Sequence, residues 1–233
     1  MITILVPAYN EEDSISALIH ALHDNIQLVE AYEILVVNDG SSDGTGTILT
    51  ELTDTIPELR VLDHPHNMGL GCALRSGFRD ARGRIIITMD ADMTHPISLI
   101  PSLIAAGDAV DVVIASRYVR GGGMSGVPWW RVALSVLANA IFQIIFATRV
   151  RDITAGYKAY RAECVRALDI SSRGFEVQLE ITIRLIASGA TFREIPYVLT
   201  TRQHGASKMR YLKLISTYAR TTVRLLQLRW GRK

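Results

Sequence analysis

Short apolar runs alternate along the chain with longer mixed segments. The apolar runs have the length and continuity of buried strands, and they cover residues 2–8, 33–37, 60–62, 85–89 and 112–115. The segments between them are predicted helices, and they cover residues 14–25, 44–55, 70–81 and 97–105. This order predicts the α/β class, with an open, doubly wound, mostly parallel sheet, right-handed crossovers and flanking helices.

Polar clusters follow three of the predicted strands. The sequence reads YNEE after the first strand, NDGSSDGT after the second and DADMTH after the fourth. In open α/β sheets, ligands bind beyond the carboxyl ends of the strands. The three clusters are therefore expected to meet in one crevice.

The third cluster places Asp90 and Asp92 at the end of a strand, with one residue between them. Because side chains alternate along a strand, both carboxylates can point the same way. Two hard oxygen ligands suit a divalent cation that keeps some waters and also binds substrate phosphates. A solvated acidic turn is the alternative interpretation of the same triplet.

The glycine patterns of other nucleotide-binding folds are incomplete here. Gly69 and Gly71 begin a dinucleotide motif, but Leu74 stands where the third glycine is needed. The phosphate-loop pattern GxxxxGK[ST] does not occur. The sequence thus disfavours dehydrogenases and P-loop enzymes, and it favours a sheet that holds a diphosphate through a metal ion on carboxylates.

Composition predicts a folded chain whose charge is unevenly distributed. Of the 233 residues 48% are hydrophobic, and the net charge is only +2. Residues 195–233 nevertheless carry nine basic and no acidic side chains, whereas residues 1–194 carry a net charge of −7. This basic end predicts a polyanionic partner, either nucleic acid or an anionic membrane, unless it serves only solubility. No signal peptide is expected, and the polar side chains within residues 132–148 argue against a transmembrane helix.

Four motifs in the first half of the chain resemble the family-2 glycosyltransferases, which have the GT-A fold. They begin at residues 6, 37, 67 and 90 and read VPAYNEE, VNDGSSDGT, NMGLGCALRSGF and DADMTHP. Later motifs resemble the subgroup of polyprenol-phosphate hexose synthases, and among them the dolichol-phosphate mannose synthases. These motifs read ASRYVRGG, WWR, DITAGYKAYR, GFEVQLE and RQHGASKM. The resemblance extends from residue 3 to near residue 210.

This resemblance implies an inverting glycosyltransferase that moves mannose from GDP-mannose to the phosphate of a polyprenol of the dolichol type. The alternative donor is UDP-glucose, which would make the product a polyprenol-phosphate glucose, and the sequence leaves the nucleobase open. A nucleic-acid-binding protein with a basic tail is the alternative from another class, but it leaves the acidic strand ends unexplained.

The family motifs also imply roles for particular residues. Those that match the base and ribose pocket are Pro7, Ala8, Tyr9, Glu11 and Asp39, the last of which contacts the base. Asp90 would lie beside the diphosphate and sugar, and it would bind Mg²⁺ or Mn²⁺ together with Asp92 and Thr94. At the position of Thr94, many relatives carry Gln as a further metal ligand. The basic residues that match phosphate-facing positions are Arg117, Arg131, Arg202 and Lys208.

A lipid acceptor implies contact with a membrane. Residues 211–228 are predicted to form an amphipathic helix with basic residues on one side and, on another, Tyr211, Ile215, Tyr218, Thr222 and Leu225. The chain is expected to comprise a catalytic domain, residues 1–207, and a membrane-associating tail, residues 208–233. It is expected to bind the cytoplasmic face of an anionic membrane peripherally, directly or through a small membrane subunit, and not to bind nucleic acid.

Overall fold

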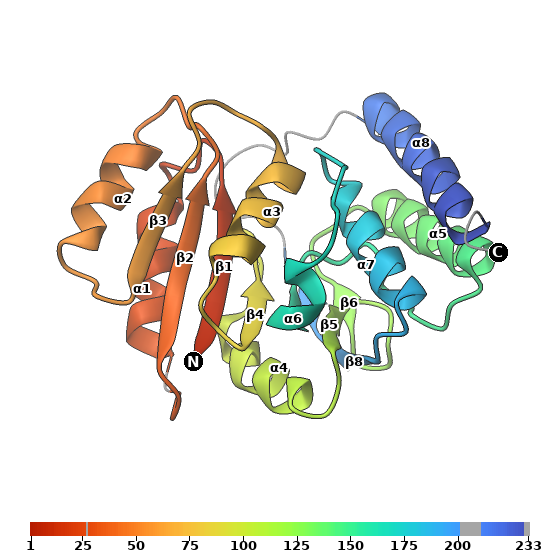
Figure 1. Cartoon of the computed structure of the whole chain (residues 1–233), viewed down its shortest axis with the longest axis horizontal. Helices are drawn as coiled ribbons and strands as arrows, with labels where there is room; N and C mark the ends of the chain where they lie inside the picture. Colours follow the sequence, from red (N-terminus) through yellow and green to blue (C-terminus); the bar gives the residue numbers. More distant parts are fainter. Residues whose placement is uncertain (27, 201–210, 231–233) are drawn as a thin grey trace.

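The computed structural model of the chain describes residues 1–26, 28–200 and 211–230. Within them, seven strands form one sheet in the order β3-β2-β1-β4-β7-β5-β8, with helices on both faces (Figure 1). The strands are β1 Ile2–Ala8, β2 Tyr32–Asn38, β3 Leu59–Asp63, β4 Ile85–Thr88, β5 Val112–Ser116, β7 Lys158–Arg161 and β8 Phe192–Pro196. Two short strands form a separate small sheet, β6 Gly123–Met124 and β9 Val198–Leu199.

The helices divide the hydrophobic core between the two faces of the sheet. They are α1 Ile15–Asn25, α2 Thr45–Thr53, α3 Leu70–Asp80, α4 Ile100–Gly107, α5 Trp129–Phe146, α6 Ala162–Arg166, α7 Val177–Ala187 and α8 Tyr211–Trp230, and the 3-10 turn η1 Ile97–Leu99 precedes α4. Because side chains alternate along β1, Ile4 and Val6 pack with α1, α2 and α4, whereas Leu5 packs with α3 and α7. Every strand and helix predicted above is present, with small differences at the ends.

Strand β7 is the main departure from the predicted sheet. It lies between β4 and β5 and runs antiparallel to both. The apolar pattern does not predict it, because its sequence KAYR has a charged residue at each end. Since β4 and β5 are both antiparallel to β7, they are parallel to each other and their carboxyl ends lie at the same edge of the sheet.

Lys158, the first residue of β7, is completely buried. Its Nζ donates hydrogen bonds to Thr182 Oγ1 at 2.8 Å and to the carbonyl oxygen of Ile153 at 3.3 Å. Burial lowers the pKa of Lys158 from 10.5 to about 7, because the charged form loses its hydration.

Replacing Lys158 with methionine is expected to change how stability depends on pH. Between pH 7 and 10.5 the unfolded chain holds a proton on Lys158 that the folded chain has lost. The free energy of unfolding of the wild-type protein should therefore rise with pH in this window because of Lys158, by up to about 1.4 kcal/mol per pH unit. Urea unfolding of both proteins at several pH values between about 7 and 9 isolates this contribution. A difference between them that does not change with pH would contradict the lowered pKa.

Helix α8 lies beside α5 and α7, at the end of the molecule away from α2 (Figure 1). Tyr218 of α8 stacks on Phe142 of α5, with ring centroids 5.7 Å apart, and Thr222 and Leu225 are buried. Of the predicted apolar stripe of α8, Tyr218, Thr222 and Leu225 are therefore turned towards the protein, whereas Ile215 is 66% exposed. The predicted domain boundary between residues 207 and 208 lies outside the described residues.

Helix α5 exposes most of its apolar side chains. Trp129 and Ile144 are each 81% exposed, and the other exposed ones include Leu134, Leu137 and Ile141. Among the described residues, α5 is the one helix that is long and apolar enough to cross a membrane, and 17% of it is buried in the fold. Length and composition do not distinguish a span from a surface helix, so the absence of a transmembrane helix stays a prediction.

Candidate active site

The carboxyl ends of β2, β1 and β4 lie next to one another, because these strands are adjacent and parallel. Asp39 follows β2, and its backbone N–H donates to the carbonyl of Ala8 at the end of β1, at 2.8 Å. The loops beyond these strands are joined by Asn10, which accepts from Ser42 N–H at 2.8 Å and donates its own N–H to Ser41 Oγ at 3.0 Å. The polar clusters after the first two strands thus meet as predicted.

The Asp39 carboxylate is almost completely buried and is held by several hydrogen bonds. Its Oδ1 accepts from Met68 N–H at 3.0 Å and pairs with His64 Nδ1 at 2.6 Å, while Oδ2 accepts from Gly69 N–H at 2.8 Å. On the other side of the imidazole, His64 Nε2 lies 2.9 Å from Ser76 Oγ in α3. These contacts fix the orientation of Asp39 between β2 and the start of α3.

Asp90 and Asp92 begin the turn that follows β4. Asp92 is buried, and its Oδ1 accepts from the backbone N–H and the hydroxyl of Thr94 at 3.1 and 2.6 Å. The side chain of Asp90, by contrast, is 46% exposed. Thr94 therefore orients Asp92, and direct binding of a metal by Thr94 stays a prediction.

His95 packs behind Asp90, a role that the sequence pattern did not indicate. Its buried ring stacks on Tyr157, with centroids 4.7 Å apart, and meets the edge of Tyr197. Its Nδ1 accepts from the backbone N–H of Asp90 at 3.0 Å, so the neutral ring carries its proton on Nε2, which lies 3.8 Å from Asp90 Oδ2. Burial lowers the pKa of His95 and favours this neutral form. The buried His95 ring thus fixes the backbone of Asp90 from the interior of the protein.

Arg117 follows β5, at the same edge of the sheet as Asp90, and is bound to Asp152. Its Nε and Nη2 donate to the two carboxylate oxygens at 2.8 and 2.6 Å, and its backbone N–H donates to Oδ2 at 2.9 Å. Asp152 is completely buried, and its own N–H donates to Glu194 Oε1 on β8. Burial by itself disfavours the charged form, but the bonds to Asp152 outweigh it and raise the pKa of Arg117. The guanidinium therefore stays charged, and its Nη1 donors are not used by Asp152.

The remaining predicted basic residues are only partly described. Arg131 lies in the first turn of α5, is exposed, and places its guanidinium over the ring of Trp130, 5.1 Å from the centroid. Arg202 and Lys208 lie outside the described residues.

The residues predicted to line the nucleoside pocket lie at or just beyond the end of β1. Ala8 is buried, Pro7 is partly buried and Tyr9 is 36% exposed. Glu11 accepts a hydrogen bond from Ser14 Oγ at 3.0 Å, at the start of α1. Their position next to Asp39 fits the expected pocket, whereas their contacts with a nucleoside stay a prediction.

The donor set at the end of β4 fits a divalent cation. The described residues contain no group of three or more His, Cys, Asp or Glu side chains placed to hold a metal by themselves. Asp90 and Asp92 supply hard oxygen ligands, which suit Mg²⁺ or Mn²⁺ when waters and substrate phosphates complete the coordination.

Comparison with known sequences identifies relatives along most of the chain. Residues 3–168 match the sequence profile of Glycosyl transferase family 2. A polyprenol monophosphomannose synthase from Mycolicibacterium smegmatis is 37% identical over 214 residues, which cover 88% of this chain and 80% of that protein. An undecaprenyl-phosphate mannosyltransferase from Micrococcus luteus is 36% identical, covering 88% and 86%. A dolichol-phosphate mannosyltransferase from Pyrococcus furiosus is 33% identical over 97% of this chain, which spans 64% of that protein's length.

Solved structures share the fold. A glucosyl-3-phosphoglycerate synthase from Mycobacterium tuberculosis, solved with Mn²⁺, UDP and glucosyl-3-phosphoglycerate, superposes with a TM-score of 0.72 at 21% identity. The superposition covers 99% of this chain and 80% of that one, and it confirms the predicted GT-A fold. The family profile and the relatives together show that this chain is a glycosyltransferase and belongs to Glycosyl transferase family 2.

Proposed function

We propose that this enzyme transfers mannose from GDP-mannose to the phosphate of a polyprenol, with inversion at the anomeric carbon and with Mg²⁺ or Mn²⁺ bound. The observation that carries the proposal is the likeness, over 88% of the chain, to a polyprenol monophosphomannose synthase. Two further named relatives are an undecaprenyl-phosphate and a dolichol-phosphate mannosyltransferase.

The carboxylates and arginines of the site suit a reaction between two phosphate-bearing substrates. The acceptor phosphate is already an anion near neutral pH, because its second pKa is about 6, so it needs no strong general base. It must instead be held close to a negatively charged diphosphate. Arg117 is charged and retains its Nη1 donors for a phosphate oxygen, and Arg131 is exposed at the start of α5.

Asp90 and Asp92 are proposed to hold the divalent cation. When bound, the cation would neutralise charge on the departing diphosphate, as a Lewis acid does. The Mn²⁺ and UDP in the glucosyl-3-phosphoglycerate synthase structure, which has the same fold, support a divalent cation beside a nucleoside diphosphate. His95 and Thr94 would keep the two carboxylates in position.

Helix α5 is proposed to face the membrane from which the lipid comes. On its inner side, Ser135 accepts from the hydroxyl of Tyr118 at 2.6 Å, and Asn139 donates to Thr154 Oγ1 at 3.1 Å. Tyr118 adjoins Arg117 in the chain, so this side of α5 borders the proposed phosphate site. The opposite side exposes apolar residues, including Leu137 and Ile144. Such a helix suits peripheral binding at the level of the lipid headgroups.

Replacing Ile144 and Leu137 with aspartate is expected to abolish most binding to vesicles that contain anionic lipid. Each change places a charge where an apolar side chain would enter the membrane. Flotation with vesicles measures the bound fraction. Val29→Asp is the matched control, because Val29 is a fully exposed apolar residue near the amino end of β2, away from α5. Equal flotation of the double variant and the wild type would contradict the proposed surface.

A donor panel tests the proposed reaction. GDP-mannose, UDP-glucose and UDP-GlcNAc, each carrying a labelled sugar, are incubated with polyprenol phosphate and Mg²⁺ or Mn²⁺, and label in the lipid phase is counted. We expect transfer from GDP-mannose and its loss when the cation is chelated. Transfer from UDP-glucose alone would show that the donor sugar is glucose and not mannose. If no label reached the lipid from any donor, the proposal that polyprenol phosphate is the acceptor would be wrong.

A further inference from the structure

Glu180 is a buried carboxylate that the proposed reaction does not use. It lies in α7, is completely inaccessible to solvent, and accepts from Ser172 N–H at 2.7 Å, Ser171 Oγ at 3.0 Å and Arg184 Nε at 2.8 Å. Burial by itself would raise the pKa of Glu180, but these bonds outweigh it and lower the pKa. Glu180 is therefore an anion that fixes residues 171–172 to α7.

Arg224 connects this anion to α8. Its Nη2 donates to Glu180 Oε2 at 3.0 Å and to Ser172 Oγ at 2.9 Å. A second contact lies about 1.7 helical turns earlier in α8, where the hydroxyl of Tyr218 donates to the carbonyl of Phe175 at 3.2 Å. Helix α8 is thus attached to the segment 171–175 at two points.

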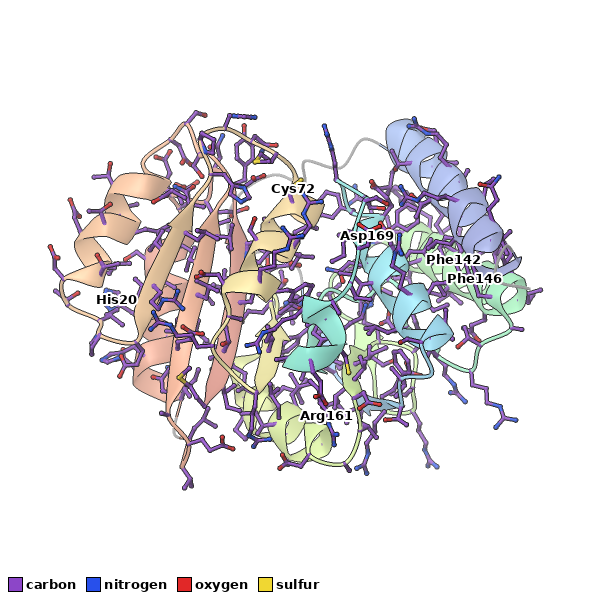
Figure 2. All side chains as sticks on the ribbon, in the orientation of Figure 1. His20, Cys72, Phe142, Phe146, Arg161 and Asp169 are labelled. Atoms are coloured by element: carbon purple, nitrogen blue, oxygen red, sulfur yellow. The ribbon has the colours of Figure 1, made fainter. Side chains whose placement is uncertain are left out.

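Residues 172–173 of this segment are in close backbone contact with the start of α3. Gly71 N–H donates to the carbonyl of Arg173 at 2.9 Å, and a Cβ on Gly71 would lie 1.9 Å from the carbonyl oxygen of Ser172. Gly69, with φ +92°, would bring a Cβ within 2.4 Å of the carbonyl oxygen of Arg173. Only glycine permits this backbone contact at either position. Figure 2 labels Cys72 of α3 and Asp169, which line a cavity beside the contact.

The two residues that precede α3 in turn hold Asp39. Gly69 donates its N–H to Asp39 Oδ2, and Met68 donates its N–H to Oδ1. The orientation of the carboxylate therefore depends on the position of this backbone. An unbroken series of contacts therefore runs from Arg224 in α8 through Glu180 and residues 171–173 to Asp39.

We propose that Glu180 and Arg224 are positioning residues for the donor, which hold segment 171–173 against α3 and thereby set the orientation of Asp39. This inference rests on the proposed function and on the role that the family motifs imply for Asp39, contact with the nucleobase. It adds that α8, which packs beside the proposed membrane-facing helix α5, also supports the nucleoside pocket. Loss of the pair should weaken recognition of the nucleoside and leave the diphosphate site at Asp90 and Asp92 unchanged.

The test compares Arg224→Met and Glu180→Gln with Arg220→Met. Arg220 is the matched control, because it is an exposed arginine of the same helix whose Nε donates to the carbonyl of Ser216 within α8. Calorimetry with Mn²⁺ gives the Kd of GDP, of UDP and of inorganic pyrophosphate. Binding is measured under conditions in which each variant has the circular dichroism spectrum of the wild type. A loss of folded protein then does not contribute to the measured Kd.

We expect Arg224→Met and Glu180→Gln to weaken binding of the preferred nucleotide by about fivefold or more, with the Kd of pyrophosphate unchanged. The KM for the sugar donor should rise in parallel while kcat stays near the wild-type value. Nucleotide affinities equal to those of wild type and Arg220→Met, or an equal loss for pyrophosphate, would overturn the proposal. A wild-type protein that binds neither GDP nor UDP would instead overturn the proposed donor site, and the inference with it.

Discussion

Replacing Asp92 with asparagine is expected to lower the rate of sugar transfer by about 100-fold to 1000-fold, the usual effect of removing one electrostatic contact to developing charge. Asparagine has the same shape, and its Oδ1 can still accept the two hydrogen bonds from Thr94 that shape the turn. What it loses is the negative charge proposed to hold the cation. Alanine is a less informative change, because Asp92 is buried and its loss would leave both Thr94 donors unpaired.

Two measurements on Asp92→Asn separate loss of the cation from loss of the fold. The affinity for Mn²⁺ should fall together with the transfer rate, while the thermal unfolding midpoint stays near the wild-type value. Asp63→Asn serves as the control, since Asp63 is an exposed carboxylate at the end of the outer strand β3. Wild-type Mn²⁺ affinity in Asp92→Asn would show that the cation binds elsewhere.

Replacing Asp152 with asparagine is expected to lower the free energy of unfolding by about 3–5 kcal/mol, because it leaves the charge of Arg117 buried without its partner. The side chains of Asp152 and Arg117 are 0% and 14% exposed, so water cannot take over the lost hydrogen bonds. Transfer should fall as well, since Arg117 is proposed to contact a phosphate. Urea unfolding and initial rates measure the two effects.

A double variant separates stability from function at this pair. Arg117→Met combined with Asp152→Asn should recover part of the lost stability, because no uncompensated charge remains, but it should not recover transfer. Asp108→Asn is the control for charge alone, because the Asp108 side chain is 57% exposed in its pair with Arg84 and should matter by no more than about 1 kcal/mol. If Asp152→Asn lowered the free energy of unfolding by no more than about 1 kcal/mol as well, a buried and unpaired Arg117 charge would not be costly, and the prediction would be wrong.

The sequence predicts strands β1 to β5 of the main sheet, but it does not predict β7 and β8. Strands β1, β2 and β4 are buried on both faces, so their sequences are continuous apolar runs. Strand β7 is equally buried, yet it begins with Lys158, whose Nζ donates hydrogen bonds to Thr182 and Ile153. The partner in α7, Thr182, lies 24 positions further along the chain, so its hydrogen bond cannot be read from the local pattern.

The site shows the same division. Asp39, Asp90 and Asp92 stand at strand ends, and the rule that ligands bind there predicts them directly. The pair of Arg117 with Asp152 joins residues 35 positions apart, and His95 acquires its role only by stacking on Tyr157. Contacts between loops decide both, and neither periodicity nor a short motif encodes them.

The two-sided character of α5 has a consequence for how this enzyme would respond to its surroundings. The polar side of α5 borders Arg117, and its exposed apolar side is proposed to face lipid. On this proposal the enzyme would meet its acceptor in two dimensions, at a density counted per unit of membrane area. Once the enzyme is bound, diluting polyprenol phosphate with neutral phospholipid should slow turnover, whereas diluting the vesicles in buffer should not. Lipid composition, and not only the supply of nucleotide sugar, would then set the rate.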